Sequence, residues 1–217
     1  MAVVRTFGRR VEFDERSRLF PIRKFLPKIT KPRSYTWSCG IVLDQSATPA
    51  CTGFSMAHEW AARPVVVQGV TNKTGMDIYH LAQELDEWPG HNYDGSSVLG
   101  AAKAAEQLGK ILEYRWAFGV DDVIATIGYH GPVVLGVNWY RGMMNPDAKG
   151  ILPVIGEVVG GHAILCNGYN VTSKLFRLHN SWGSSWGIKG ECFVTAKDMA
   201  RLLSEDGEAC VPVRRHL

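Results

Sequence analysis

The sequence predicts an α+β fold in which helices come first along the chain and strands second. In the first half, apolar residues recur every three to four positions, as at Phe54, Ala57 and Ala61, which is helical spacing. After Gly131-Pro132 the pattern changes to short β-prone runs separated by Gly, Asn and Pro clusters, as in an antiparallel sheet or barrel. Helices and strands that are segregated in this way favour two lobes.

We divide the chain into an N-terminal strap (1–36), a helical lobe (37–130) and a strand-rich lobe (131–217), which together form a single unit. The strap is rich in Arg and Lys and is interrupted by Pro21, Pro27 and Pro32, so it cannot form one long helix. We expect it to lie extended against the body. Its apolar residues have a spacing that indicates burial; they are Phe20, Ile22, Phe25 and Leu26.

Four helices are expected before residue 131. The first begins at Cys51 and stops before Pro64, and a capping-box-like Thr74-Gly75-Met76-Asp77 starts the second. The third runs from about Ser97 to Leu108 with Gly109 as its stop, and Asp121 caps a short fourth helix through Tyr129.

The strand-rich half contains five β-prone runs and one short helix. The helix is expected over about Lys197 to Leu203, between the last two strands. The strands are expected at Val133–Val137, His162–Cys166, Leu175–Leu178, Glu191–Thr195 and Ala209–Val213.

Bulk composition excludes several classes of function. The 217 residues are 46% hydrophobic and 21% charged, as in ordinary globular proteins, and the net charge of +3 is too small to argue for nucleic acid. No apolar run approaches the length of a membrane span, and the N-terminus lacks the apolar core of a secretory signal. We therefore expect a cytoplasmic protein with neither a nucleic-acid nor a membrane partner; its oligomeric state stays open.

No metal or cofactor is expected. The five cysteines have wide spacings and form no CxxC pair, and Cys39, Cys166, Cys192 and Cys210 are expected to fill the core. Six histidines show no metal-ligand pattern; they are His58, His80, His91, His130, His179 and His216.

Three motifs carry chemistry. Asn180-Ser181-Trp182-Gly183-Ser184-Ser185-Trp186-Gly187 places a polar residue before two tryptophans in a Gly-rich frame. Upstream lies Gly160-Gly161-His162-Ala163-Ile164-Leu165, and near the start lies Gln45-Ser46-Ala47-Thr48-Pro49-Ala50-Cys51-Thr52-Gly53-Phe54-Ser55. These segments resemble, in order, the asparagine, histidine and nucleophile segments of papain-like cysteine proteases (peptidase family C1). The resemblance covers roughly residues 37–213 and is typical of a compact bacterial or bacteriophage-type member.

The resemblance implies a papain-like fold, in which a helical lobe and an antiparallel β-barrel lobe meet at a cleft. It also implies four catalytic residues: Cys51 as nucleophile, His162 as base, Asn180 as the residue that orients it, and Gln45 as the oxyanion donor. Trp182 corresponds to the family's tryptophan that shields the His–Asn bond. Gly95, Ser96 and Ser97 stand where the family has a Gly-rich substrate-binding loop, and Gly161 lies beside His162 as a further candidate substrate contact.

The residue types suit this chemistry. A thiol becomes a good nucleophile when a neighbouring imidazolium and a helix N-terminus lower its pKa, and Cys51 begins a helical segment. His162 is expected to open a strand of the other lobe and to face Cys51. Preorganised donors such as the amide of Gln45 stabilise the negative charge of a tetrahedral intermediate. Trp186 is expected to be a core aromatic, and His179 to face away from the site.

The sequence departs from the family at several positions. Thr48 replaces the usual cysteine of a disulfide, Thr52 replaces a tryptophan, and Ser46 replaces a glycine, so substrate preference cannot be carried over. We expect a cysteine endopeptidase acting on peptide or protein substrates. The alternatives are a hydrolase of another amide, such as a peptidoglycan peptide, and a non-catalytic binding module. The strap is either a brace, which its short length favours, or a pro-segment in the cleft.

Overall fold

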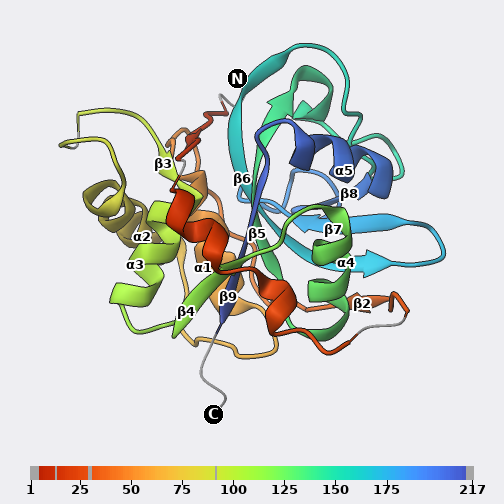
Figure 1. Cartoon of the computed structure of the whole chain (residues 1–217). Helices are drawn as coiled ribbons and strands as arrows, with labels where there is room; N and C mark the ends of the chain where they lie inside the picture. The colour runs from red at the N-terminus through yellow and green to blue at the C-terminus, as the bar shows by residue number, and fades with distance from the viewer. Residues whose placement is uncertain (1–4, 13, 29–30, 91, 214–217) are drawn as a thin grey trace.

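The chain folds into a helical part and a sheet part that lie side by side (Figure 1). The computed structural model describes residues 5–12, 14–28, 31–90 and 92–213. In Figure 1 the helices α1, α2 and α3 gather on one side, and the strands β6 to β8 with the helices α4 and α5 gather on the other. The expected order of helices first and strands second is therefore present.

The helical part is held together by close packing of α1 (Cys51–Ala61) on α2 (Asn72–Leu85), with α3 (Val98–Gln107) beside them. Every residue of α1 is buried. A Cβ at Gly53 would lie 2.2 Å from the carbonyl oxygen of Gly75, so the two helices meet where neither has a side chain. This contact fixes the helix that begins at Cys51.

Helix starts follow capping chemistry. The α2 helix begins earlier than expected because Thr71, and not Thr74, is its N-cap; Thr74 completes a capping box from the third position. The α3 helix begins one residue after the expected start, because Ser97 is its N-cap and accepts the N–H of Gly100. The fourth helix, α4, spans Val120–Tyr129, and α5 spans Ala196–Ser204.

The sheet part is one seven-stranded antiparallel sheet with the strand order β4-β9-β5-β6-β7-β8, and β2 pairs with β6 outside this path. The strands are β2 (Tyr35–Thr36), β4 (Glu113–Trp116), β5 (Val133–Tyr140), β6 (Val158–Asn170), β7 (Leu175–His179), β8 (Glu191–Thr195) and β9 (Glu208–Val213).

The resemblance implied a β-barrel lobe, whereas among the described residues β4 and β8 do not pair and the antiparallel sheet stays open. The free edge of β8 is instead bonded by a loop. The N–H of Leu152 donates to the carbonyl of Phe193, and the N–H of Phe193 donates to the carbonyl of Gly150. Because this loop satisfies the edge, β8 needs no further strand. The short 3-10 helix η3 (Arg141–Met144) follows β5.

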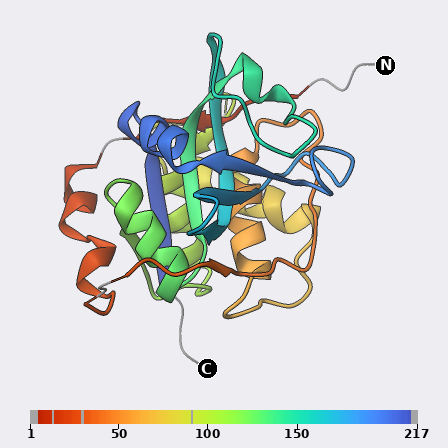
Figure 2. The same cartoon turned by 90° about the vertical axis from the view of Figure 1, so that its right-hand side faces the viewer.

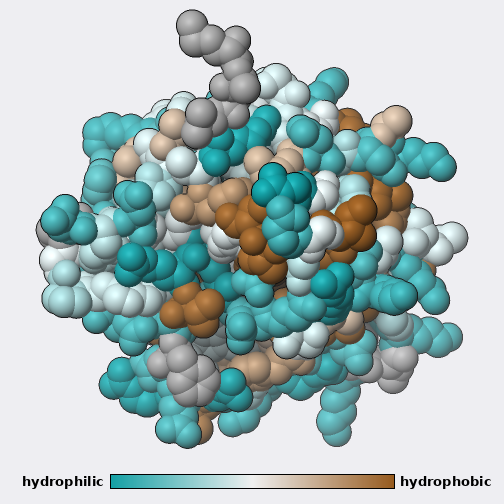
Figure 3. Space-filling view, turned by 90° about the horizontal axis from the view of Figure 1, so that it is seen from above, coloured by the Kyte–Doolittle hydropathy of each residue, from teal (hydrophilic) through white to brown (hydrophobic). Residues whose placement is uncertain are grey.

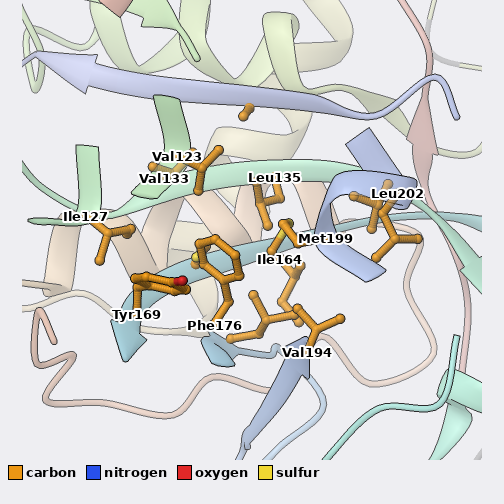
Figure 4. Close-up of a cluster of buried hydrophobic side chains, with 14 of the residues drawn as sticks. Val123, Ile127, Val133, Leu135, Ile164, Tyr169, Phe176, Val194, Met199 and Leu202 are labelled. Atoms are coloured by element: carbon orange, nitrogen blue, oxygen red, sulfur yellow. The ribbon is translucent and has the colours of Figure 1, made fainter. Parts of the chain in front are cut away.

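Two helices cover the sheet and close its core (Figure 4). Apolar side chains from α4 and α5 meet those of the central strands in one cluster; the labelled members are Val123, Ile127, Val133, Leu135, Ile164, Tyr169, Phe176, Val194, Met199 and Leu202. A second cluster lies between α1, α2 and α3 and includes Cys51 and Phe54. Each part therefore has its own core.

The strap passes both parts of the molecule. Its strand β1 (Arg9–Arg10) pairs in parallel with β3 (Ser96–Ser97), and the 3-10 helices η1 (Glu15–Leu19) and η2 (Ile22–Lys24) follow. Figure 2 shows the red and orange strap running along the outside of the sheet part. Ile22 and Leu26 are buried as expected, whereas Phe20 and Phe25 are half exposed, since they contact the guanidinium of Arg115 on the surface.

Figure 3 shows the molecule from above the view of Figure 1. Apolar residues gather near the middle of this face and hydrophilic residues border them. No helix of the described residues is both long and apolar enough to cross a bilayer. All five cysteines are free thiols; Cys39 is partly exposed and the other four are buried.

Candidate active site

Cys51 is the first residue of α1 and is fully buried. Its Sγ atom accepts a hydrogen bond from the backbone N–H of Ala163, at 3.4 Å. Burial raises the pKa of the Cys51 thiol, and hydrogen bonds from the backbones of Ala163 and Gly8 partly oppose that rise. The sulfur thus lies between the sheet part, through Ala163, and the strap, through Gly8.

His162 lies within β6 and does not open it as expected, because the strand starts at Val158. Its Nε2 is 2.8 Å from Oδ1 of Asn180, a residue that directly follows β7. Oδ1 also accepts the N–H of Ser181, which fixes it as the amide oxygen. Nε2 therefore carries the proton and donates it, and Nδ1, which has no partner among the described residues, remains a proton acceptor.

Aromatic rings surround the imidazole. Trp139 contacts the His162 ring edge-on at 4.7 Å between centroids, and Trp182 lies over it at 4.8 Å. This burial lowers the pKa of His162 to about 4, although the Asn180 hydrogen bond acts in the other direction. In this state His162 is neutral at pH 7 and Cys51 is a thiol, so the pair is not ionised.

Gln45 is buried and precedes the nucleophile helix. Its Oε1 accepts a hydrogen bond from the hydroxyl of Ser181 at 2.7 Å, which leaves Nε2 as a donor. Nε2 donates to the carbonyl of Thr48 at 2.7 Å and to the carbonyl of Thr6 at 3.3 Å. The structure thus links Gln45 to Asn180 through Ser181, so the polar residues of three distant segments form one cluster.

Strap residues occupy the space in front of this cluster. The ring of Phe7 stands edge-on to His162 at 6.1 Å and to Trp182 at 6.0 Å. The guanidinium of Arg5 lies 4.6 Å above the Trp182 ring. A Cβ at Gly8 would lie 1.7 Å from the carbonyl oxygen of Pro49, so only glycine fits at this position. The sulfur and the imidazole are therefore covered by the chain's own N-terminal segment.

The expected substrate contacts touch that same segment. The N–H of Ser96 donates to the carbonyl of Gly8 at 2.8 Å, and a Cβ at Gly95 would meet the Gly8 carbonyl at 2.3 Å. A Cβ at Gly161 would lie 2.3 Å from the carbonyl of Arg9. Ser97 caps α3 and hydrogen-bonds Glu12 of the strap. These four residues form a surface that holds an extended peptide backbone.

Sequence reasoning missed three residues. Ser181 positions the Gln45 amide, Trp139 packs on the imidazole, and Arg9 forms a buried ion pair with Glu208. The only sequence signal for Ser181 was its place beside Asn180, and neither Trp139 nor Arg9 lies in a motif.

Two further histidines among the described residues, His58 and His179, lie together in the interior. His179 is buried, hydrogen-bonds Glu191 and the carbonyl of Ile41, and meets the His58 ring edge-on at 4.4 Å between centroids. Within the described part of the chain no group of His, Cys, Asp or Glu side chains could hold a metal ion. His91 and His216 lie outside the described residues. Trp186 is buried against Trp182, as expected of a core aromatic.

Comparisons with known proteins agree on one family. A sequence model described as papain family cysteine protease matches residues 37–204. The chain is 36% identical over 64 residues to an uncharacterized peptidase C1-like protein of Acanthamoeba polyphaga mimivirus, and 28% identical over 88 residues to a cysteine protease of Blomia tropicalis. These alignments cover 27% and 38% of this chain but only 21% and 26% of the two relatives.

Solved structures show the same fold. Xylellain, a cysteine protease from Xylella fastidiosa, superposes with a TM-score of 0.74 at 18% identity, over 100% of both chains. The digestive procathepsin L 3 of the Tenebrio molitor larval midgut superposes with a TM-score of 0.63 at 13% identity, over 97% of this chain and 76% of that one. Because the sequence identities are this low, the superpositions show a shared fold and nothing beyond it.

Proposed function

The chain belongs to the papain family of cysteine proteases, and from that premise we propose that it is a cysteine endopeptidase whose active site is covered by its own strap. One observation carries the proposal. Cys51 at the start of α1 accepts the N–H of Ala163, and His162, the neighbour of Ala163, is hydrogen-bonded to Asn180. A thiol, an imidazole and an orienting amide in this order are the parts that nucleophilic acyl transfer requires.

The proposed reaction begins with proton transfer from Cys51 to Nδ1 of His162, the ring nitrogen that the Asn180 hydrogen bond leaves free. The thiolate attacks the carbonyl carbon of a peptide bond, and the electron pair of the C=O bond moves to oxygen. Donation from Nε2 of Gln45 and from the Cys51 backbone stabilises this oxyanion. His162 then gives its proton to the leaving amine, and water hydrolyses the thioester to regenerate the thiol.

We further propose that the covered state is latent. The Thr6 carbonyl engages the Gln45 donor, and Phe7 lies against His162. Burial also keeps the Cys51 pKa high and the His162 pKa low, the opposite of what a thiolate–imidazolium pair needs. Solvent that enters when the strap moves away removes this burial, so exposure and activation are the same event.

The two earlier hypotheses for the strap then apply to different parts of it. Residues 5–10 cover the cleft, whereas Ile22 and Leu26 pack into the apolar core of the sheet part. We propose that the first part inhibits and the second part anchors.

The function is tested with a peptide library and mass-spectrometric mapping of the cut bonds. The full chain should cleave slowly, Cys51→Ser should not cleave at all, and the control Cys166→Ser, which changes a buried core thiol of β6, should cleave like the parent. Equal cleavage by Cys51→Ser and the parent would contradict the assignment, and cleavage of non-peptide amides alone would favour the hydrolase alternative.

A further inference from the structure

Arg9 of the strap places its side chain in a buried pocket of the body. Its backbone pairs with Ser96 of β3, and its side chain is only 1% exposed. Nε lies 3.0 Å from Oε1 of Glu208, at the start of β9, and Nη2 donates to the backbone carbonyl of Asp206. Two nitrogens of one planar guanidinium therefore meet two acceptors placed for them.

The pocket exists because two body residues lack side chains. A Cβ at Gly136 of β5 would lie 2.7 Å from Oε1 of Glu208, 2.8 Å from Cγ2 of Val98 and 2.9 Å from Nε of Arg9. A Cβ at Gly161 would collide with the Arg9 carbonyl. Any larger residue at position 136 would fill the space that the guanidinium occupies, so the pocket is a built feature of the sheet.

The pocket adjoins the proposed nucleophile. Arg9 follows Gly8, whose backbone hydrogen-bonds the sulfur of Cys51, and the positive charge of Arg9 lowers the pKa of that thiol. On the other side, Gly161 precedes His162. A side chain that enters this pocket therefore belongs to a residue close to the bond under attack.

The surroundings suit a long cation. A cavity of about 320 Å³ borders Arg9, Asp206 and Glu208 and is lined on its apolar side by Leu99, Ala117 and Leu203, which can contact a methylene stem. Two further carboxylates that line the cavity, Glu12 and Asp14, belong to the strap and are paired with Lys103 and Arg16. Of the two acids of the body, Asp206 offers Arg9 its backbone carbonyl and Glu208 its carboxylate, so Glu208 is the acid that meets a ligand when Arg9 leaves.

We propose that Glu208 is a specificity-determining residue, which selects peptide substrates with a basic side chain, arginine before lysine, in the pocket that Arg9 fills here. This inference rests on the proposed function, and it names the substrate class of that site. An apolar substrate side chain would leave the buried carboxylate without its partner, whereas a guanidinium restores both hydrogen bonds. A site built to bond a polar group rejects analogues that lack it. The planar guanidinium of arginine, with its several N–H donors, matches two acceptors better than the ammonium of lysine does.

The pocket is tested first without catalysis. Full-chain Arg9→Ala empties it, and n-propylguanidinium should raise the melting temperature of this variant and bind it in calorimetry, whereas the neutral n-propylurea should not. Arg9→Ala/Glu208→Gln should lose this binding. If Arg9→Ala does not fold, Arg9→Gln replaces it; the shorter side chain keeps part of the stem and leaves the guanidinium end of the pocket free, so this variant is probed with methylguanidinium against methylurea. Equal binding of the cation and the urea, or binding that survives Glu208→Gln, would overturn the proposal.

Substrate choice is tested next in the full-chain Gly8→Ala background, in which we expect the strap to be displaced because the added methyl would overlap the Pro49 carbonyl. Arginine should be enriched at one fixed position of the cleaved peptides. Glu208→Gln should lower the ratio of kcat/KM for the arginine peptide over its leucine counterpart at least roughly tenfold, with cleavage of the leucine peptide retained.

The control Glu113→Gln, which changes a carboxylate paired with Arg115 in β4, should leave that ratio unchanged. A ratio that Glu208→Gln does not alter would overturn the inference. A library left uncut by every variant would overturn the proposed peptidase, and the guanidinium binding still decides the pocket on its own.

Discussion

The carbonyl oxygen of Thr6 lies 3.3 Å from the side-chain nitrogen of Gln45 and accepts its hydrogen bond. The donor that we assign to a tetrahedral intermediate is therefore engaged by the chain itself. Any substrate that uses Gln45 must first displace Thr6, and so the covered and the active states exclude each other.

Gly8→Ala should uncover Cys51. The added methyl would lie 1.7 Å from the Pro49 carbonyl, and the backbone cannot absorb such an overlap unless the strap moves. We expect Cys51 to react with iodoacetamide at least about tenfold faster than in the parent, since reactivity follows exposure and thiolate content. Peptide mapping after timed alkylation measures it. Gly40→Ala is the matched control, because nothing lies within 4 Å of its Cβ. An unchanged rate in Gly8→Ala would show that the strap does not limit access.

Gln45→Ala in the Gly8→Ala background should lower kcat by roughly a hundredfold to a thousandfold with little change in KM, because it removes a donor to the transition state. Steady-state kinetics on one fluorogenic peptide measures both constants. Gln107→Ala is the control; this glutamine is exposed at the end of α3. A kcat unaffected by Gln45→Ala would remove Gln45 from the chemistry.

Asn180→Ala should also lower kcat, because the His162 ring loses the hydrogen bond that fixes its proton on Nε2. The pH profile distinguishes this effect from simple destabilisation: the Asn180 bond raises the pKa of His162, so the limb of the profile that reports His162 should move to lower pH. A fall in kcat without any movement of that limb would indicate a structural role instead.

Acid should lower the free energy of unfolding of the covered protein through His162. Its pKa is about 4 when buried and 6.5 in the unfolded chain, so the unfolded chain binds the proton more readily. The stability contributed by neutral His162 is therefore full above pH 6.5 and is lost as the pH falls through 4, by at most roughly 3 kcal/mol. Urea unfolding at several pH values measures the slope, and His162→Gln should remove this contribution.

Glu208 should change the stability of the protein with pH in the opposite direction, and it serves as the comparison. Burial raises its pKa to about 7 against the pull of Arg9, so its contribution is full below pH 4.5 and is lost as the pH rises through 7. Glu208→Gln should therefore leave a protein whose stability falls more steeply on acidification than that of the parent. If the free energy of unfolding depended on pH with the same slope in the parent, His162→Gln and Glu208→Gln, the pH effects assigned to His162 and Glu208 would be contradicted.

Ile22→Ala should destabilise the protein without uncovering Cys51. Ile22 is fully buried in the core of the sheet part, so its truncation should cost about 2–5 kcal/mol. Phe25→Ala is the matched control; its ring is half exposed, and the loss should be clearly smaller. Chemical denaturation measures stability, and alkylation of Cys51 under native conditions should be the same in both. Faster alkylation in Ile22→Ala would mean that anchoring and covering are not separate.

The sequence predicted those parts of the site that lie in local motifs. Gln45, Cys51, His162 and Asn180 were each identified from their neighbours along the chain, and the structure brings the four into one cluster. Arg9 could not be found in this way, because its partner Glu208 is 199 residues away. The same holds for Gly8, whose need for glycine arises from Pro49 in another segment.

The positions of most strands could be predicted from the sequence, but the closure of the sheet could not. Strand positions such as Glu191–Thr195 follow from β-prone runs, whereas whether the sheet closes depends on which backbone satisfies the edge of β8. Here it is the loop at Gly150 and Leu152, and no periodicity marks a loop that bonds an edge. The β4 strand was missed for a related reason: Glu113–Trp116 alternates charged and aromatic residues over only four positions, and its pairing with the distant β9 holds it in place.

The continuity of the strap sets how strongly it competes with substrate. Residues 5–10 and the anchor at Ile22 belong to one chain, and so the cover faces the cleft at a fixed effective concentration, of millimolar order for a short flexible tether. Dilution of the protein cannot release it, and a free peptide of equal intrinsic affinity would have to exceed that concentration to enter. If the chain were cut between residue 10 and Ile22, residues 5–10 would bind the cleft as a separate peptide. The cleft would then open at ordinary working concentrations of the protein.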